Sequence, residues 1–288
     1  MNTTKIDSRK TKMIAHRGVS GIECENTAAA FVAAGNRSYY GIETDVHRTS
    51  DGQYIIIHDD NTVRVSGKEI SVENNDFDTL RSLILKDRFG RTRGDLRLPT
   101  LEEYLRICAD YGKIGVLELK NPFPAEDVKN ILETVKKEYS LDKMIFISFD
   151  YQNLVYLRGS SKTASLQYLC GCTVDASLLE KLKAYNLDLD TEHSFLTESA
   201  IGYLHDNGIK VNCWTVDDKS RAEELAAWGL TCAAVSAWIL LFYEVCRSSA
   251  AAILTLFAVN VVFLFLAGGI IPSVFLPELV QKVGNMTV

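Results

Sequence analysis

The stretch "GIETDVHRTSDGQYIIIH", residues 41–58, decides the fold because it contains two apolar runs separated by a turn. The runs cover residues 41–46 and 54–58, and the short polar segment between them contains Ser50-Asp51-Gly52. A parallel crossover needs a dozen or more residues, so this connection predicts an antiparallel hairpin return. The second run is therefore an extra arm outside the main parallel series.

Strand-like and helix-like segments alternate along most of the chain, which is typical of a parallel sheet with crossover helices. Thr100-Leu-Glu-Glu103 is a capping box that predicts a helix start, and Pro124 and Thr197 precede two further helices. Besides 41–46, runs rich in branched or aromatic residues predict parallel strands at 13–16, 114–119, 144–148, 164–169, 187–190, 209–216 and 230–236. Eight parallel strands are the number that closes into an α/β (β/α)8 TIM barrel.

The barrel is expected to cover residues 13–246, after a polar N-terminal segment of residues 1–12. Residues 63–98 lack clear periodicity and hold many charges, so they predict a small insertion after the second strand. The last predicted strand continues into "LTCAAVSAWILLFYEVC", residues 230–246, which is almost wholly apolar. This leaves two alternatives, an ordinary eighth strand followed by an apolar closing helix, or an altered closure of the barrel.

Charge and hydropathy indicate which partners and surroundings suit the protein. The formal net charge is −6, with a pI near 5.5, which argues against a nucleic-acid partner. No charged residue occurs from Ser248 to Pro277, and residues 248–271 are long enough to span a bilayer as a helix. Residues 247–288 are therefore expected to anchor the protein in a lipid bilayer, with Arg247 and the absence of a signal peptide favouring a cytoplasmic catalytic domain. The alternative is a helix that packs on the barrel.

Paired acidic residues occur late in two predicted strands. Side chains two residues apart share one face of a strand, so Glu43 and Asp45 point the same way, as do Glu118 and Lys120. Three carboxylates in one barrel mouth repel one another unless positive charge lies between them. A hard divalent cation, Mg²⁺ or Ca²⁺, is the simplest neutraliser, whereas salt bridges within the barrel are the alternative.

Two of the five histidines, His16 and His58, end strand-like runs. Imidazoles transfer protons near neutral pH, and Arg17 and Lys120 add positive charge suited to a phosphate. The set predicts hydrolysis of a phosphate ester. The other three histidines have no convincing motif context, and His47 is expected to be a surface or hairpin residue.

The chain resembles the glycerophosphodiester phosphodiesterase family over about Met13 to Trp228. The resemblance rests on "AHRG", "ENT", "GIETDVHRTSDG", "HDD", "LPTLEEYL", "ELK" and "VNCWTVDD", which occur in this order. It implies a (β/α)8 barrel with a small insertion, a divalent metal ion, and hydrolysis of glycerophosphodiesters to glycerol 3-phosphate and an alcohol.

The resemblance also implies roles for individual residues. His16 and His58 correspond to an acid/base pair, and Arg17 and Lys120 to residues at the phosphate. Trp214 matches an aromatic residue beside the glycerol site, although a core tryptophan is an open alternative. Glu25 in "ENT" matches a glutamate with a supporting role. The metal ligands implied by the motifs are Glu43, Asp45 and Glu118.

Two alternatives to glycerophosphodiester hydrolysis remain at this point. A membrane anchor would also suit a lysophospholipase D-like enzyme that acts on membrane-borne lysophospholipids. A non-catalytic barrel used as a binding module is the other alternative, although it would not need both His16 and His58.

Overall fold

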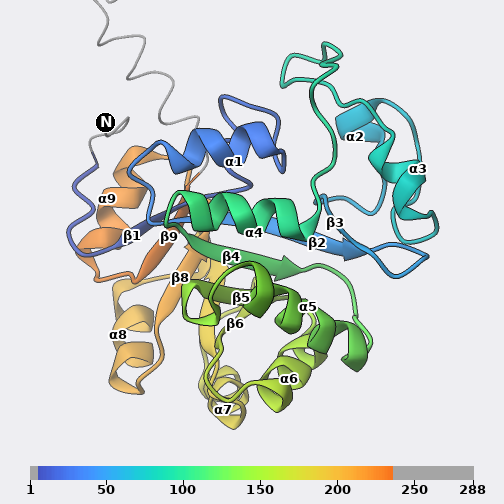
Figure 1. Cartoon of the computed structure of the whole chain (residues 1–288). Coiled ribbons are helices and arrows are strands. Elements are labelled where there is room, and N and C mark those ends of the chain that lie inside the picture. The colour runs from blue at the N-terminus through green and yellow to red at the C-terminus, as the bar shows by residue number, and fades with distance from the viewer. Residues whose placement is uncertain (1–5, 236–288) are drawn as a thin grey trace, which may run out of the picture. The chain divides into compact units, whose positions relative to one another are not determined.

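The computed structural model describes residues 6–235, in which nine strands form one sheet (Figure 1). Eight of them pair in parallel in the order β1-β9-β8-β7-β6-β5-β4-β2, and β1 also pairs with β2, which closes the ring. The eight are β1 (Lys12–Ala15), β2 (Gly41–Arg48), β4 (Ile114–Leu119), β5 (Met144–Ser148), β6 (Ser165–Cys170), β7 (Asp188–Glu192), β8 (Val211–Trp214) and β9 (Cys232–Val235). The predicted (β/α)8 barrel is confirmed.

The last strand closes the barrel in regular register. In the pairing of β9 with β1, Cys232 lies opposite Lys12 and Val235 lies opposite Ala15. The alternative of an altered closure is therefore wrong, because β9 pairs with β1 over all four of its residues in an ordinary parallel ladder. The helix expected after this strand lies outside the described residues.

The hairpin expected within residues 41–58 is present. Strand β3 (Tyr54–Ile56) runs antiparallel to β2, with Val46 opposite Ile56 and Arg48 opposite Tyr54. Gly52 in the connecting turn has φ +82°, a left-handed conformation that glycine adopts without strain. The extra arm thus extends β2 beyond the barrel ring and does not add a ninth barrel strand.

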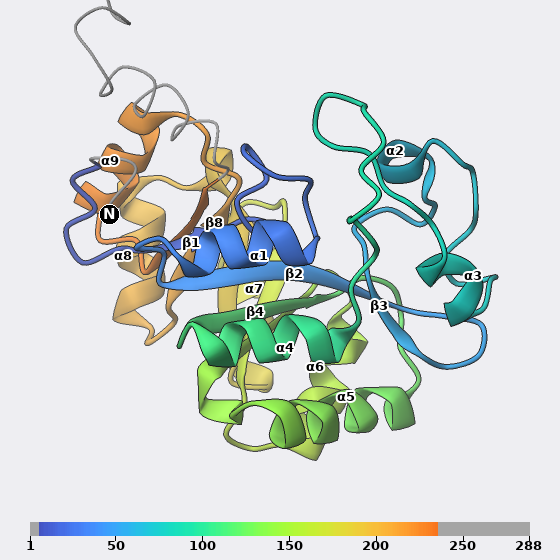
Figure 2. The same cartoon turned by 45° about the horizontal axis from the view of Figure 1, so that its top comes forward.

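Helices connect successive barrel strands and cover the outside of the ring (Figures 1 and 2). Thr100 caps α4 as predicted, because its hydroxyl accepts from the Glu103 amide and the Glu103 carboxylate accepts from the Thr100 amide. The crossover helices are α1 (Ala28–Gly35), α4 (Leu101–Asp110), α5 (Ala125–Glu138), α6 (Tyr151–Ser160), α7 (Ala176–Ala184), α8 (Glu198–Asp206) and α9 (Lys219–Ala227).

The main core lies between these helices and the outer surface of the barrel. The rings of Phe31 on α1 and Tyr104 on α4 meet edge to face, with centroids 5.2 Å apart. The Tyr104 hydroxyl also donates to the carbonyl oxygen of Ile42, at 2.7 Å. This buried bond ties α4 to β2, the strand that carries Glu43 and Asp45.

The insertion lies beyond the carboxyl ends of β2 and β4 in both views (Figures 1 and 2). It contains the short helices α2 (Val63–Ser66) and α3 (Phe77–Arg81). Its apolar side chains form a separate buried cluster that includes Val65, Val72 and Leu80. Residues 63–98, which showed no periodicity in the sequence, therefore have a small core of their own. They lie at the C-terminal face of the barrel, the face that carries active sites in TIM barrels.

The interior of the barrel has an apolar layer below the predicted site. Ile14 precedes His16 by two residues and Val116 precedes Glu118 by two, so each lies one layer deeper on the same face. Both belong to a buried cluster that also contains Ile147. This layer separates the carboxyl ends of the strands from the opposite end of the barrel.

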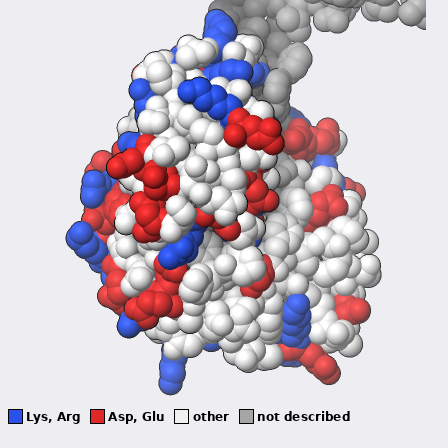
Figure 3. Space-filling model, turned by 90° about the vertical axis from the view of Figure 1, so that its right-hand side faces the viewer, with Lys and Arg blue, Asp and Glu red and all other residues white. Residues whose placement is uncertain are grey.

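On the face that carries the insertion, acidic and basic side chains are interspersed (Figure 3). Within residues 6–235 no helix is both long and apolar enough to cross a membrane. The predicted span at 248–271, the boundary at residue 246 and the segment 247–288 lie outside the described residues, as do residues 1–5.

Candidate active site

The turn after β1 presents His16 and Arg17 at the mouth of the barrel. Arg17 and Gly18 both have left-handed backbones, with φ +54° and +73°. A Cβ on Gly18 would lie 2.7 Å from the backbone carbon of Ala30, so only glycine fits this position. The Arg17 amide donates to Glu43 Oε2 at 2.7 Å. The strained turn thus places a backbone donor and a guanidinium against the acidic strand β2.

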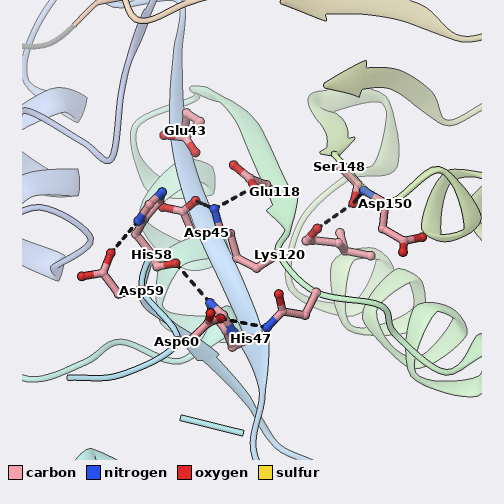
Figure 4. Close-up of polar contacts among 12 residues, drawn as sticks. Glu43, Asp45, His47, His58, Asp59, Asp60, Glu118, Lys120, Ser148 and Asp150 are labelled. Atoms are coloured by element: carbon pink, nitrogen blue, oxygen red, sulfur yellow. Dashed lines mark hydrogen bonds and ion pairs between the residues drawn. The ribbon is translucent and has the colours of Figure 1, made fainter. Parts of the chain in front are cut away.

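Three carboxylates converge at this end of the barrel (Figure 4). Glu43 and Asp45 extend from β2 and Glu118 from β4, and one oxygen of each lies within 4.8 Å of the other two. All three residues are buried. The alternation of side chains along each strand therefore brought these residues together as the sequence predicted.

Two cations lie against the carboxylates. Lys120 Nζ is 2.8 Å from Glu118 Oε1 and 3.5 Å from Asp45 Oδ1, while Arg17 Nε is 3.5 Å from Asp45 Oδ2. Burial opposes ionisation of Asp45, but Arg17 and Lys120 outweigh it and lower the pKa of that carboxyl. The salt bridges considered from the sequence are therefore present, and they centre on Asp45.

At the other two carboxylates the positive charge does not offset burial, even though Lys120 lies 2.8 Å from Glu118. Burial and repulsion from Asp45 raise the pKa of Glu43 well above its ordinary value and raise the pKa of Glu118 to about 8. Asp45 Oδ1 and Glu118 Oε1 are buried and accept no well-directed hydrogen bond. An all-oxygen set of this kind fits a hard divalent cation, which would supply the missing positive charge.

Asn26 is a member of the site that the sequence analysis missed. Its amide donates to Asp45 Oδ2 at 2.7 Å, and its carbonyl oxygen accepts from the Thr44 hydroxyl at 2.8 Å. The backbone of Asn26 is left-handed, with φ +52°. Its backbone N–H, as distinct from the side-chain amide, donates to the carbonyl oxygen of Arg17. The "ENT" motif was the sequence feature that could have pointed to Asn26. Only the contact with Asp45, 19 positions away, shows that this asparagine holds the carboxylate in place.

The two histidines differ in their surroundings. His58 Nδ1 lies 2.7 Å from Asp59 Oδ1, and burial lowers the pKa of His58. His16 Nε2 lies 3.9 Å from Glu43 Oε2, and burial together with the neighbouring Arg17 charge lowers the pKa of His16 to about 4. Both rings are therefore neutral near neutral pH, a state in which a ring nitrogen can accept a proton.

A sequence model described as the "Glycerophosphoryl diester phosphodiesterase family" matches residues 16–236, about three quarters of the chain. The chain belongs to this family. The glycerophosphodiester phosphodiesterase of Caldanaerobacter subterraneus subsp. tengcongensis is 30% identical over 232 residues, which cover 77% of this chain and 92% of that protein. The enzyme of the same name from Bacillus altitudinis is 26% identical over 231 residues, which cover 76% and 92%.

A solved structure supports the same assignment. A phosphodiesterase from Oleispira antarctica, in complex with the product sn-glycerol-3-phosphate, matches with a TM-score of 0.73 and 25% identity, covering 85% of this chain and 98% of that one. The identification of the chain as a glycerophosphodiester phosphodiesterase is therefore confirmed.

In this member of the glycerophosphoryl diester phosphodiesterase family, His47 was expected to be a surface or hairpin residue. It lies in the hairpin, opposite Ile55, but it is not at the surface. The His47 side chain is fully buried, with Nδ1 3.2 Å from Glu73 Oε1. Its Nε2 lies 3.3 Å from the carbonyl oxygen of His58, the contact drawn in Figure 4. Asn121 also donates to Glu73, at 2.8 Å. The insertion covers the hairpin at this point, so His47 supports the backbone of His58 and is not exposed.

Trp214 lies at the end of β8, on the rim of the barrel of this phosphodiesterase. Its ring meets Phe149 edge to face, with centroids 5.6 Å apart, and Phe149 is 45% exposed. Trp214 also packs on the apolar interior layer. The Trp214 ring thus packs on the barrel core and also contacts a half-exposed residue at the rim. Its contact with substrate stays a prediction.

Proposed function

We propose that this member of the glycerophosphoryl diester phosphodiesterase family hydrolyses glycerophosphodiesters to glycerol 3-phosphate and an alcohol, using a divalent cation and two histidines. The observation that carries the proposal is the convergence of three buried carboxylates within 4.8 Å of one another at the mouth of the barrel. The two histidine-bearing segments lie at the same mouth, since His16 contacts Glu43 and His58 lies beside Asp45 (Figure 4).

Glu43, Asp45 and Glu118 would hold the cation, either Mg²⁺ or Ca²⁺. When bound, such an ion polarises a phosphoryl oxygen and neutralises the charge that develops in the transition state. Arg17 offers a planar fork for two phosphate oxygens, and Lys120 adds a point charge beside the carboxylates. These groups would orient the phosphodiester with its leaving oxygen toward the histidines.

The histidines would divide the proton transfers between them. One ring, in its neutral form, would take the proton of the attacking oxygen and become an imidazolium. The other would have to enter the reaction as an imidazolium, a form that the negative charge of a bound phosphodiester favours, and would become neutral as it gives its proton to the leaving alcohol. The Asp59 carboxylate accepts from His58 Nδ1, which leaves His58 Nε2 free to exchange a proton with the substrate. Asp59 thus fixes the tautomer that the reaction requires.

Removal of the metal is the experiment that tests this proposal. Glycerophosphocholine is incubated with the purified chain, and released glycerol 3-phosphate is measured with Mg²⁺, with Ca²⁺, and after treatment with EDTA. We expect release that EDTA abolishes and that an excess of the cation restores, because the carboxylate cluster is under-compensated without it. Release that is insensitive to EDTA would contradict the metal role, and no release with any cation would favour a binding module.

The apolar tail suggests a lipid surface as the place of action. We propose that residues 247–288 anchor the protein in a bilayer with the catalytic domain on the cytoplasmic side, and that lysophospholipids are a second substrate class. The support is the uncharged run from Ser248 to Pro277.

Fractionation tests the anchor. The full chain is expected to sediment with membranes and resist extraction by carbonate, whereas a chain ending at residue 246 is expected in the supernatant. Equal recovery of the full chain in the supernatant would contradict the anchor. Release of choline from lysophosphatidylcholine, compared with its release from glycerophosphocholine, tests the second substrate class.

A further inference from the structure

Arg64, on the short insertion helix α2, binds two carboxylates at once. Its Nε lies 2.6 Å from Asp59 Oδ2, and its NH2 nitrogen lies 2.9 Å from Asp59 Oδ1. The same guanidinium reaches Glu25, with NH1 2.8 Å from Oε2 and NH2 2.9 Å from Oε1. A planar fork with five donors can make two such bidentate contacts, which a lysine cannot.

Each of these carboxylates holds a residue of the active site. Asp59 Oδ1 accepts from His58 Nδ1 at 2.7 Å (Figure 4). Glu25 Oε1 accepts from the NH1 nitrogen of Arg17 at 3.0 Å. Hydrogen bonds therefore form a continuous chain from His58 through Asp59, Arg64 and Glu25 to Arg17, and the charges of the last four residues alternate.

We infer that Arg64 is a positioning residue that sets the orientation of His58 and Arg17 by fixing Asp59 and Glu25. The inference rests on the proposed function, because it assigns Arg64 to the same site. His58 comes from the hairpin side of the site and Arg17 from the turn after β1, and the insertion supplies a cation that bonds to both of their carboxylate partners.

The loss of Arg64 would act on both ends of this chain. Asp59 and Glu25 would lose a shared cation, so each carboxylate could rotate away from its partner. His58 would then lose the preference for its Nδ1–H tautomer, and the Arg17 guanidinium would lose its fixed plane. The Arg64 side chain is 43% exposed, so its truncation leaves no buried cavity.

Kinetics of Arg64 variants test the inference. Arg64→Ala is expected to lower kcat by about tenfold to a hundredfold, the usual cost of losing a group that orients a functional residue. Arg64→Lys is expected to recover part of this loss, since it restores the charge without the fork. The matched control is Arg91→Ala in the same insertion, where the arginine is 74% exposed and pairs with Asp87. This variant is expected to keep the wild-type kcat.

A coupling experiment separates positioning from a general structural role. In an Asp59→Asn/Glu25→Gln background, adding Arg64→Ala is expected to change kcat by less than about twofold, because its partners are already lost. The inference would be overturned if Arg64→Ala lowered kcat in this background by the same factor as in the wild type. It would also be overturned if Arg64→Ala alone kept the wild-type kcat.

A readout independent of activity completes the test. In ¹⁵N-histidine NMR spectra of the metal-free protein, His58 is expected as the Nδ1–H tautomer in the wild type and in Arg91→Ala, and as a mixture of tautomers in Arg64→Ala. Unchanged His58 signals in Arg64→Ala would overturn the inference even if kcat falls. If the wild type released no glycerol 3-phosphate, the proposed function would fail while the spectra still decided the role of Arg64.

Discussion

Replacement of His58 by alanine is expected to lower kcat for glycerophosphodiester hydrolysis by about 10²–10⁴-fold, and His16→Ala by a similar factor. The physical reason is the loss of a positioned proton donor or acceptor at the moment when the alcohol leaves or the attacking oxygen is activated. The measurement is release of glycerol 3-phosphate from glycerophosphocholine at saturating substrate and cation, across pH 5 to 9.

The chain contains a matched control for these variants. His205 lies near the end of α8, is exposed, and belongs to no contact of the site. His205→Ala is therefore expected to retain wild-type kcat and the wild-type pH profile. Near-normal turnover in His16→Ala or His58→Ala, with melting temperatures like the wild type, would reject the acid/base assignment.

Glu118→Gln is expected to lower kcat by about a thousandfold or more and to remove the response to added cation. A bound divalent ion contributes several kcal/mol of transition-state stabilisation, and each 1.4 kcal/mol corresponds to a factor of ten. The substitution keeps the volume of the side chain but removes the negative charge beside Asp45. The measurement is kcat as a function of Mg²⁺ and Ca²⁺ concentration.

The same variant is expected to stabilise the metal-free protein at alkaline pH. The pKa of Glu118 rises from 4.5 to about 8 in the folded state, so the native state binds this proton more tightly than the unfolded state. The free energy of unfolding of the metal-free wild type therefore falls as pH increases from 4.5 through 8. A neutral glutamine removes this loss, and each kcal/mol regained raises the melting temperature by about 2–4 °C.

Thermal unfolding at pH 6 and pH 8, with EDTA or with Mg²⁺, checks this expectation. The control is Glu133→Gln on α5, where the glutamate is 61% exposed and pairs with Lys136. It is expected to unfold like the wild type under all four conditions. A Glu118→Gln protein that still gains stability from Mg²⁺, or that is less stable than the wild type in EDTA at pH 8, would contradict the role of Glu118 in the cluster.

Much of the fold follows from local patterns in the sequence. The short Ser50-Asp51-Gly52 connection allowed only a hairpin, and removing its second arm left eight strands, the number found in the ring. The spacing of Glu43 and Asp45 placed both on one face of β2, since the direction of strand side chains repeats every two residues. Backbone geometry over a few residues is enough for such inferences.

The missed features depend on residues that are distant in sequence. His47 was expected to be a surface or hairpin residue. It lies in the hairpin, but Glu73 of the insertion contacts it and its side chain is buried. Asn26 acts on Asp45, 19 positions away, and Arg64 acts on Glu25, 39 positions away. No periodicity in the insertion indicates which of its charged side chains turns toward the barrel.

The sequence by itself determined the order of strands and helices, the faces on which the acidic residues lie, and the family that the motifs identify, because these depend on short-range geometry and on rare residue combinations. The tertiary structure alone decided the closure between β1 and β9, the burial of His47, and the chain of alternating charges through Arg64. These features arise only when the folded backbone brings distant segments within a few ångströms, where hydrogen bonds and ion pairs act.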